Sequence, residues 1–158
     1  KKVEENQMNF KFYGWETADR VKAKNDLYPG IHSPLDLYQA LSYIWCADTC
    51  APRMRNEWSE ENKTLGQCSI TAFLAQDIFG GDVYGLKTKN GSIHCYNVVD
   101  GYAFDLTSEQ FGEEAKDLVY EGNEIQHRNS AIHFQKEEKK LRYEYLRQEL
   151  NKKDVRRS

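Results

Sequence analysis

The chain has 158 residues, a length that fits one domain with a substantial hydrophobic core. The hydrophobic fraction of 39% and the aromatic fraction of 13% are typical of a globular protein. The formal net charge of -3 disfavours nucleic acid as a partner. No apolar run approaches the roughly 18 residues of a membrane span, so we expect no membrane partner. No charged and apolar leader precedes the first element, although the chain begins with Lys1 and not with Met.

The four cysteines are too few for a disulfide scaffold at this length. Cys46 and Cys50 lie four residues apart, a spacing that can place both thiols on one helix face, but regular helix does not favour a bridge there. We therefore expect reduced thiols and a cytoplasmic location. The spacing of the cysteines and His94 does not match paired zinc knuckles, so we expect no metal site and no cofactor.

The N-terminal part, residues 1–31, is expected to be an extension of uncertain structure. It holds an aromatic cluster without a clear period, and the alternation around Phe10 and Phe12 suggests a strand or a segment draped on the core. A helix is expected next, because Ser33 is a good N-cap and Pro34 suits the first turn.

A second helix is expected to begin at Cys68, because apolar residues then recur near one face. Gly80-Gly81 would end it. Three strands should follow, with tight turns at Asn90-Gly91 and Asp100-Gly101. These strands are expected at Val83 to Thr88, Ser92 to Val99 and Tyr102 to Leu106.

The last third of the chain reads as helix. Thr107 and Gln110 resemble a capping box that opens a short helical segment. A charged helix from Phe134 to about Leu150 would dock through apolar residues on its inner side, namely Leu141, Tyr145 and Leu146. The basic end, residues 151–158, is expected to be frayed. We thus predict a single α+β domain over residues 32–150, with the Cys68 helix packed on an antiparallel sheet and further helices around it.

Cys68, His94 and Asp105 are the strongest candidates for a functional site. A thiol at a helix N-terminus, a histidine on one strand and a carboxylate on the next are the three parts of a thiol-dependent acyl-transfer site. Cys68 would be the nucleophile, His94 the general base and acid, and Asp105 the group that orients the histidine.

The register of the second hairpin supports this grouping. If Asp100-Gly101 is a two-residue loop, His94 and Asp105 share one face of the sheet as diagonal neighbours, and diagonal neighbours can touch. Asn97, the rival orienting residue, would lie on the opposite face. The pairs expected from this register are Val99 with Tyr102, Asn97 with Phe104, and Tyr96 with Asp105.

Three residues around the thiol are expected to support it. The N–H groups and positive dipole of a helix start favour a thiolate and can hold an oxyanion. Gln67 would be an additional donor, Gly66 would let the backbone approach closely, and Ser69 lies next to the thiol in the same motif. Trp45, Trp58, Tyr96 and Asn97 are candidates for the walls of a substrate cleft, although buried aromatics are the simpler expectation.

Several motifs together resemble the YunG-like family of small bacterial proteins. They are Gly66-Gln67-Cys68-Ser69-Ile70-Thr71-Ala72, Gly80-Gly81, His94-Cys95-Tyr96-Asn97, Gly101, and Asp105-Leu106-Thr107-Ser108-Glu109-Gln110-Phe111. Trp45, Thr49, Trp58 and Arg142-Tyr143 also fit the family, and the resemblance covers roughly residues 33–150. One departure is Cys95, where the family pattern leads us to expect an aromatic residue.

The wider pattern is similar to transglutaminase-like and papain-like cysteine enzymes. That resemblance implies a fold of this class and the roles given above for Cys68, His94 and Asp105. The substrate stays open among peptides, proteins and small amides, and so does the oligomeric state.

Two alternatives remain. A binding or structural module on the same fold would have an unreactive Cys68, because apolar burial disfavours the thiolate. A redox-sensing protein would oxidise Cys68 reversibly, with Cys46 or Cys50 as the partner thiol. Cys95 is expected in the core and turned away from His94, because neighbours on a strand face opposite sides.

Overall fold

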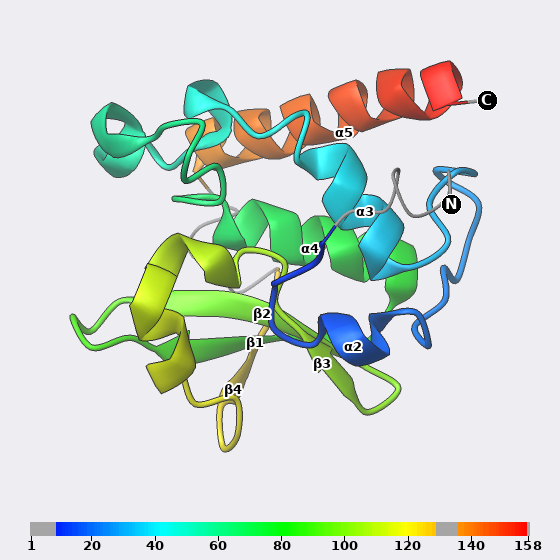
Figure 1. Ribbon diagram of the computed structural model, residues 1–158. Helices are drawn as coiled ribbons and strands as arrows, with labels where there is room; N and C mark the ends of the chain where they lie inside the picture. The colour runs from blue at the N-terminus through cyan, green and yellow to red at the C-terminus, as the bar shows by residue number, and fades with distance from the viewer. Residues whose placement is uncertain (1–8, 129–135, 158) are drawn as a thin grey trace.

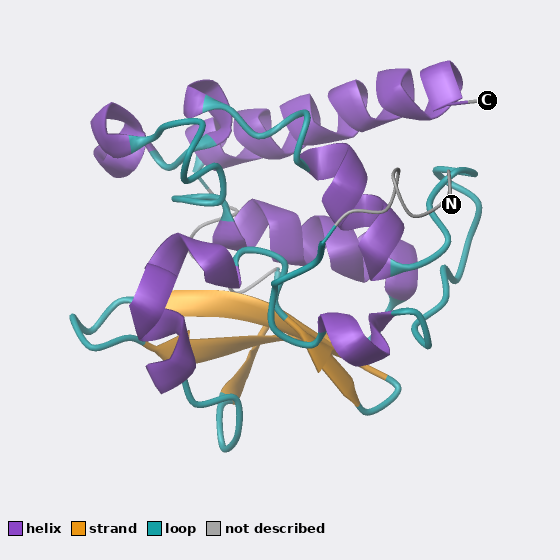
Figure 2. Ribbon diagram, in the orientation of Figure 1, coloured by secondary structure: helices purple, strands orange, loops and turns teal. Residues whose placement is uncertain are grey.

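The computed structural model of the protein describes residues 9–128 and 136–157. Its centre is the helix α4 (Cys68–Phe79), which lies between a β-sheet on one side and the long helix α5 (Glu137–Arg157) on the other (Figure 1). Figure 2 shows the two kinds of structure in separate layers, with the strands below and most helices above them. The predicted α+β architecture is therefore confirmed.

The sheet has four antiparallel strands in the order β3-β2-β1-β4. The three predicted strands are present as β1 (Asp82–Lys87), β2 (Ile93–Val99) and β3 (Tyr102–Phe104). The fourth, β4 (Glu124–Gln126), was not predicted. It is three residues long and mostly exposed, so it carries no apolar alternation that a sequence pattern could show.

The turn between β2 and β3 has the predicted geometry. Asp100 and Gly101 have φ values of 54° and 86°, as a two-residue type I′ turn requires. The pairs Val99 with Tyr102 and Asn97 with Phe104 form as expected. The expected pair of Tyr96 with Asp105 does not form in the ladder, because Asp105 leaves β3 and makes an isolated bridge with Tyr13.

The two helices that the sequence predicts in the first half of the chain both form. In α3 (Pro34–Leu41) the Ser33 side chain accepts a hydrogen bond from the Leu35 amide, so the predicted cap is confirmed. Nine of the twelve residues of α4 are buried. This helix is covered on nearly all sides and not on one face alone, because it fills the space between two layers.

The short 3₁₀ segments are η1 (Ala47–Thr49), η2 (Pro52–Glu57) and η3 (Ser108–Asp117). The capping box expected at the start of η3 is wrong, since the Thr107 side chain makes no cap hydrogen bond there. Its hydroxyl donates instead to Asp105 Oδ1, and Gln110 Nε2 donates to the Thr107 carbonyl. A nearby buried carboxylate has thus taken the hydroxyl that would otherwise cap the helix.

Helix α5 extends to Arg157 and so includes most of the basic end that we expected to be frayed. The first residues of the predicted helix, from Phe134 on, lie outside the described residues. The expected docking face is wrong in part: Leu146 is buried, whereas Leu141 and Tyr145 are 61% and 40% exposed. The face that packs on the body consists of Tyr143, Leu146 and Leu150. None of the described helices is long and apolar enough to span a membrane.

The described part of the N-terminal segment, residues 9–31, packs into the core of the domain. Residues 9–31 include the helix α2 (Trp15–Ala18), and five of their side chains join the same hydrophobic core as α3, α4 and α5. These are Phe12, Ala18, Val21, Tyr28 and Ile31. Phe12 packs against Tyr38 of α3, with ring centroids 4.9 Å apart.

Phe12→Ala should lower the free energy of unfolding by about 3–5 kcal/mol, because it leaves a cavity in the shared core. Leu27→Ala, in the same segment but at a side chain that is 49% exposed, should cost much less. Urea unfolding of both variants measures the difference. Equal stability of the two variants would mean that the segment is only loosely attached.

Candidate functional site

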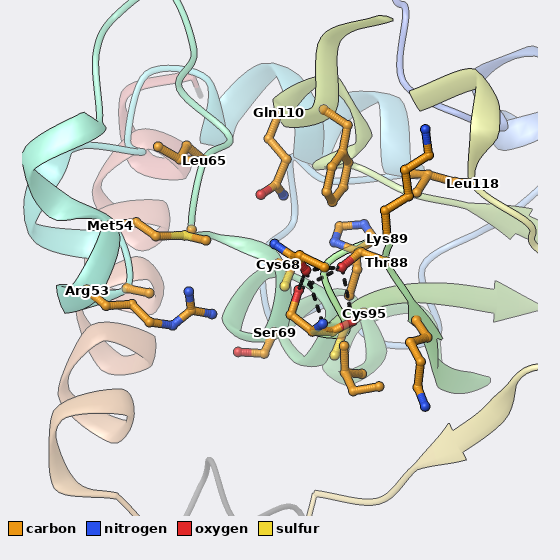
Figure 3. A pocket seen from close by; sticks show the side chains of 18 of the residues that line it. Arg53, Met54, Leu65, Cys68, Ser69, Thr88, Lys89, Cys95, Gln110 and Leu118 are labelled. Atoms are coloured by element: carbon orange, nitrogen blue, oxygen red, sulfur yellow. Dashed lines mark hydrogen bonds between the residues drawn. The ribbon is translucent and has the colours of Figure 1, made fainter. Parts of the chain in front are cut away.

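A cavity of about 620 Å³ opens at the N-terminus of α4 (Figure 3). Cys68 and His94 both line it. Its walls come from η2, from the loop before α4, from β1 and β2 with their connecting turn, from η3 and from α5. The cavity thus gathers residues from Ala51 to Arg142, which lie 91 positions apart in the chain.

Cys68 is the first residue of α4 and is partly exposed to the cavity. A hydrogen bond from the Cys95 thiol lowers the pKa of Cys68, and the hydrogen bond and charge of His94 lower it further. Burial acts in the opposite direction and is outweighed. The helix start adds a favourable dipole, because the first amides of a helix have no partners within it. The thiol at this position is therefore disposed to ionise.

His94 is buried between Cys68 and Asp105. Its Nε2 lies 2.7 Å from Asp105 Oδ2, and both side chains are at most 2% exposed. Burial lowers the pKa of His94, but the charge and hydrogen bond of Asp105, with those of Cys68, raise it to about 10. Because Nε2 is engaged with Asp105, Nδ1 is the ring nitrogen left for Cys68. The sequence-predicted trio is thus brought together, with an imidazolium and a thiolate as the favoured resting pair.

Asp105 is held by groups besides His94. Its Oδ1 accepts from the Thr107 amide at 3.2 Å and the Thr107 hydroxyl at 3.4 Å. Its Oδ2 also accepts from the Tyr120 hydroxyl at 2.6 Å. A buried carboxylate with all these donors is fixed in position, and it fixes the imidazole in turn.

Tyr120 is the residue of this network that sequence reasoning missed. It follows η3 in a stretch without helical or strand period, so no pattern singled it out. In the structure its ring stacks on Tyr13 with centroids 3.7 Å apart and meets Tyr96 edge to face at 4.9 Å. Burial and the charge of Asp105 raise the pKa of Tyr120, so the hydroxyl stays protonated and remains a donor.

Cys95 is buried, as expected, but its thiol is engaged with Cys68. Burial and the contact with Cys68 raise the pKa of Cys95, so it is the proton donor of the pair. On the same face of β2, Asn97 donates to the Ala72 carbonyl of α4 at 2.9 Å. Asn97 therefore faces α4 and lies away from His94, as the hairpin register predicts.

The three expected supporting residues have different positions. Gly66 lines the cavity with φ +72°, and a side chain there would lie 2.5 Å from the Cys50 sulfur. Gln67 is fully buried and does not line the cavity; its Nε2 donates to the Cys46 carbonyl. The expectation of Gln67 as a donor to the cavity is therefore not met, since its amide holds the preceding loop. Ser69 lines the cavity, and its Oγ accepts from Lys139 Nζ at 2.8 Å.

The expected cleft walls are wrong. Trp45, Trp58, Tyr96 and Asn97 do not line the cavity. The indole of Trp45 donates to the Thr71 hydroxyl, and that of Trp58 donates to the Lys63 carbonyl. The expectation of buried aromatics holds for Trp45 and Tyr96, whereas Trp58 is half-buried. Apolar patterns do not show against which neighbours these side chains pack.

The apolar part of the wall comes instead from Met54, Leu65, Ile93, Phe111 and Leu118. Phe111 packs edge to face on the His94 ring, with centroids 4.8 Å apart. It thus covers the imidazole on the cavity side. All four cysteines are free thiols, and among the described residues no group of three or more His, Cys, Asp or Glu side chains is arranged to hold a metal ion.

Asp105→Asn should lower the pKa of His94 well below its value of about 10, because it removes the negative charge that stabilises the imidazolium. An NMR titration of the ring resonances measures this. In the native protein the His94 ring should stay protonated through neutral pH. A ring that titrates near 6.5 in both proteins would contradict the coupling.

Tyr120→Phe should lower the free energy of unfolding by about 1.5–3 kcal/mol, because it removes a hydrogen bond to a buried charged group. Tyr84→Phe is the matched control, since Tyr84 also packs against Tyr96 but does not bond to Asp105. Thermal and urea unfolding compare the two variants. The same small loss in both would mean that the Tyr120 hydroxyl adds nothing to the network.

Comparison with known proteins places these residues within a family. The model of the YunG protein family matches residues 33–154 and so includes Cys68, His94 and Asp105. The chain is 43% identical over 56 residues to a curated protein of Bacillus subtilis (strain 168), "Uncharacterized protein YunG". That match covers 35% of this chain and 48% of the relative, so the chain spans about half the length of the relative. No solved structure matches the chain. On the family match, the chain belongs to the YunG family.

Proposed function

We propose that the protein is a cysteine-dependent hydrolase or acyltransferase that acts on an amide or ester carbonyl. The observation that carries this proposal is the contact of Cys68, whose pKa is lowered, with His94, whose other nitrogen is held by buried Asp105. Activated thiol, proton-transfer group and orienting carboxylate are the parts that such chemistry needs. Their opening onto a cavity gives a carbonyl compound access.

In the acylation step the Cys68 thiolate attacks the carbonyl carbon and forms the carbon–sulfur bond. The carbonyl electron pair moves to oxygen, and the first-turn amides of α4, which begins at Cys68, would donate to that oxyanion. When the intermediate collapses, the bond to the amine or alcohol breaks and His94 Nδ1 gives its proton to the leaving group. Asp105 keeps the imidazole in place throughout.

In the second step the thioester passes its acyl group to water or to an amine. Neutral His94 takes a proton from the attacking group, the carbon–sulfur bond breaks, and the Cys68 thiolate returns. Peptidase, amidase, deamidase and transglutaminase reactions share the first step and differ in the acceptor of the second. The proposed fold class is accordingly papain-like or transglutaminase-like, supported by a helix that begins with the thiol and packs on the sheet with His94.

A redox-sensing function is the second candidate, and one contact favours it. The Cys95 thiol makes a hydrogen bond with Cys68, although the partner thiols expected from the sequence were Cys46 and Cys50. A peroxide would oxidise the Cys68 thiolate to a sulfenic acid. The Cys95 thiol would then displace its oxygen as water and form a disulfide.

The test of acyl transfer is twofold. Iodoacetamide alkylation of each cysteine, followed by peptide mass spectrometry, should be fast at Cys68 alone below about pH 8. His94→Ala should abolish that advantage, whereas His32→Ala, at an exposed histidine, should not. A p-nitrophenyl ester should then give a burst of nitrophenol and an acyl adduct on Cys68, slowed about 10²- to 10⁴-fold by His94→Ala.

The other outcomes separate the alternatives. Slow alkylation of Cys68 that His94→Ala leaves unchanged would refute acyl transfer and favour a binding or structural module. A reactive Cys68 that forms no acyl adduct, but gives a Cys68–Cys95 disulfide with peroxide, would establish the redox function instead.

A further inference from the structure

The cavity at Cys68 has a charge opposite to that of the whole protein. Five Lys and Arg side chains line it against two carboxylates, whereas the chain carries a formal net charge of -3. The basic side chains are Arg53, Lys87, Lys89, Lys139 and Arg142, and the acidic ones are Glu114 and Asp117. A concave surface with such an excess of positive charge attracts anions.

Two of these basic residues are already neutralised by ion pairs. Arg142 bonds to Glu138 at 2.9 Å and Lys89 lies 3.5 Å from Asp117. Arg53, Lys87 and Lys139 form no ion pair with a carboxylate among the described residues. The positive charge available to a ligand therefore comes from these three.

Lys139 lies beside the start of α4, where the reactive thiol is. Its ammonium donates to the hydroxyl of Ser69, the residue after Cys68, and its charge acts on the Cys68 thiol. Burial lowers the pKa of Lys139, which is the cost of holding a cation in the cavity without a carboxylate partner. An anion bound beside it would relieve that cost.

Arg53 also lies near Ser69, the residue to which Lys139 bonds. It belongs to η2, is exposed, and points from the edge of the cavity toward Ser69 in Figure 3. Met54 and Leu65 form an apolar surface beside it (Figure 3). A ligand would thus meet cations on one side and hydrocarbon on the other.

We propose that the substrate of the Cys68 site is an acyl compound that carries an anionic group, a carboxylate or a phosphate, held by Lys139 and Arg53 beside the reacting carbonyl. This inference rests on the proposed function and adds the class of substrate to it. The apolar wall at Met54 and Leu65 receives the hydrocarbon part of the same molecule.

Two alkylating reagents of nearly the same size test the charge preference. Iodoacetate is anionic and iodoacetamide is neutral, and in both cases the thiolate displaces iodide and forms a carbon–sulfur bond. The ratio of the iodoacetate rate to the iodoacetamide rate at Cys68 does not depend on the thiolate fraction, since both reagents need the same thiolate. We expect this ratio to exceed that of the denaturant-unfolded chain by about tenfold at low salt and to fall as salt is added.

Substitutions test whether Lys139 and Arg53 cause the preference for the anionic reagent. Lys139→Met and Arg53→Met should each lower the ratio several-fold, Lys139→Arg should keep it, and Glu114→Gln should raise it. Lys22→Met is the control for overall charge, because Lys22 is exposed and does not line the cavity. An unchanged ratio in Lys139→Met and Arg53→Met, or an equal loss in Lys22→Met, would overturn the proposal.

Protection of Cys68 from alkylation by added anions identifies the anionic group that the site binds. Succinate and inorganic phosphate, compared with chloride at equal ionic strength, should slow the alkylation of Cys68 by iodoacetamide. Protection by only one of them identifies the group that the site prefers, and protection by neither would refute an anion site. A high ratio without any acyl adduct would show that the anion site exists while the proposed acyl transfer, and with it the acyl nature of the ligand, fails.

Discussion

The hydrogen bond between His94 and Asp105 is the interaction on which the rest of the site depends. A carboxylate that is almost completely buried is stable only with several donors, and Asp105 has the imidazole, the Thr107 amide and hydroxyl, and the Tyr120 hydroxyl. These donors come from separate segments of the chain. The burial of one charge therefore ties β2, the loop after β3 and the segment after η3 into one rigid unit.

The same network determines the electrostatics of the cavity. Asp105 stabilises the His94 imidazolium, and the imidazolium favours the Cys68 thiolate, as does the thiol of Cys95. Lys139 adds a second cation on the other side of α4's first turn. The imidazolium of His94 offsets the negative charge of the thiolate, so the excess of Lys and Arg still leaves the cavity positively charged. The proposed nucleophile and the proposed anion preference are therefore compatible.

Much of the scaffold could be predicted from local signals. Ser33 before Pro34, the apolar run after Cys68 and the glycine turns each act through neighbours in the chain. The helices α3 and α4 and the first three strands were therefore placed within a few residues. The Asp100-Gly101 turn set the hairpin register as far as the pair of Asn97 with Phe104, which leaves Asp105 next to the strand and within reach of His94. The expectations that failed concern Gln67, the cleft walls, the capping box and the docking face of α5. Each of these depends on which group a side chain meets in the folded protein: Gln67 meets the Cys46 carbonyl, and the Thr107 hydroxyl meets the buried Asp105.

The sequence by itself determined the order of α3, α4 and the first three strands, the hairpin register as far as Phe104, and the choice of Cys68, His94 and Asp105 as candidates. These follow from periodicity and turn geometry. Only the tertiary structure decided that residues 9–31 belong to the core and that Tyr120 bonds to Asp105. The same holds for the contact of Cys95 with Cys68 and for the basic residues of the cavity. These are contacts between segments far apart in the chain, and their formation depends on how the layers pack, which no local pattern encodes.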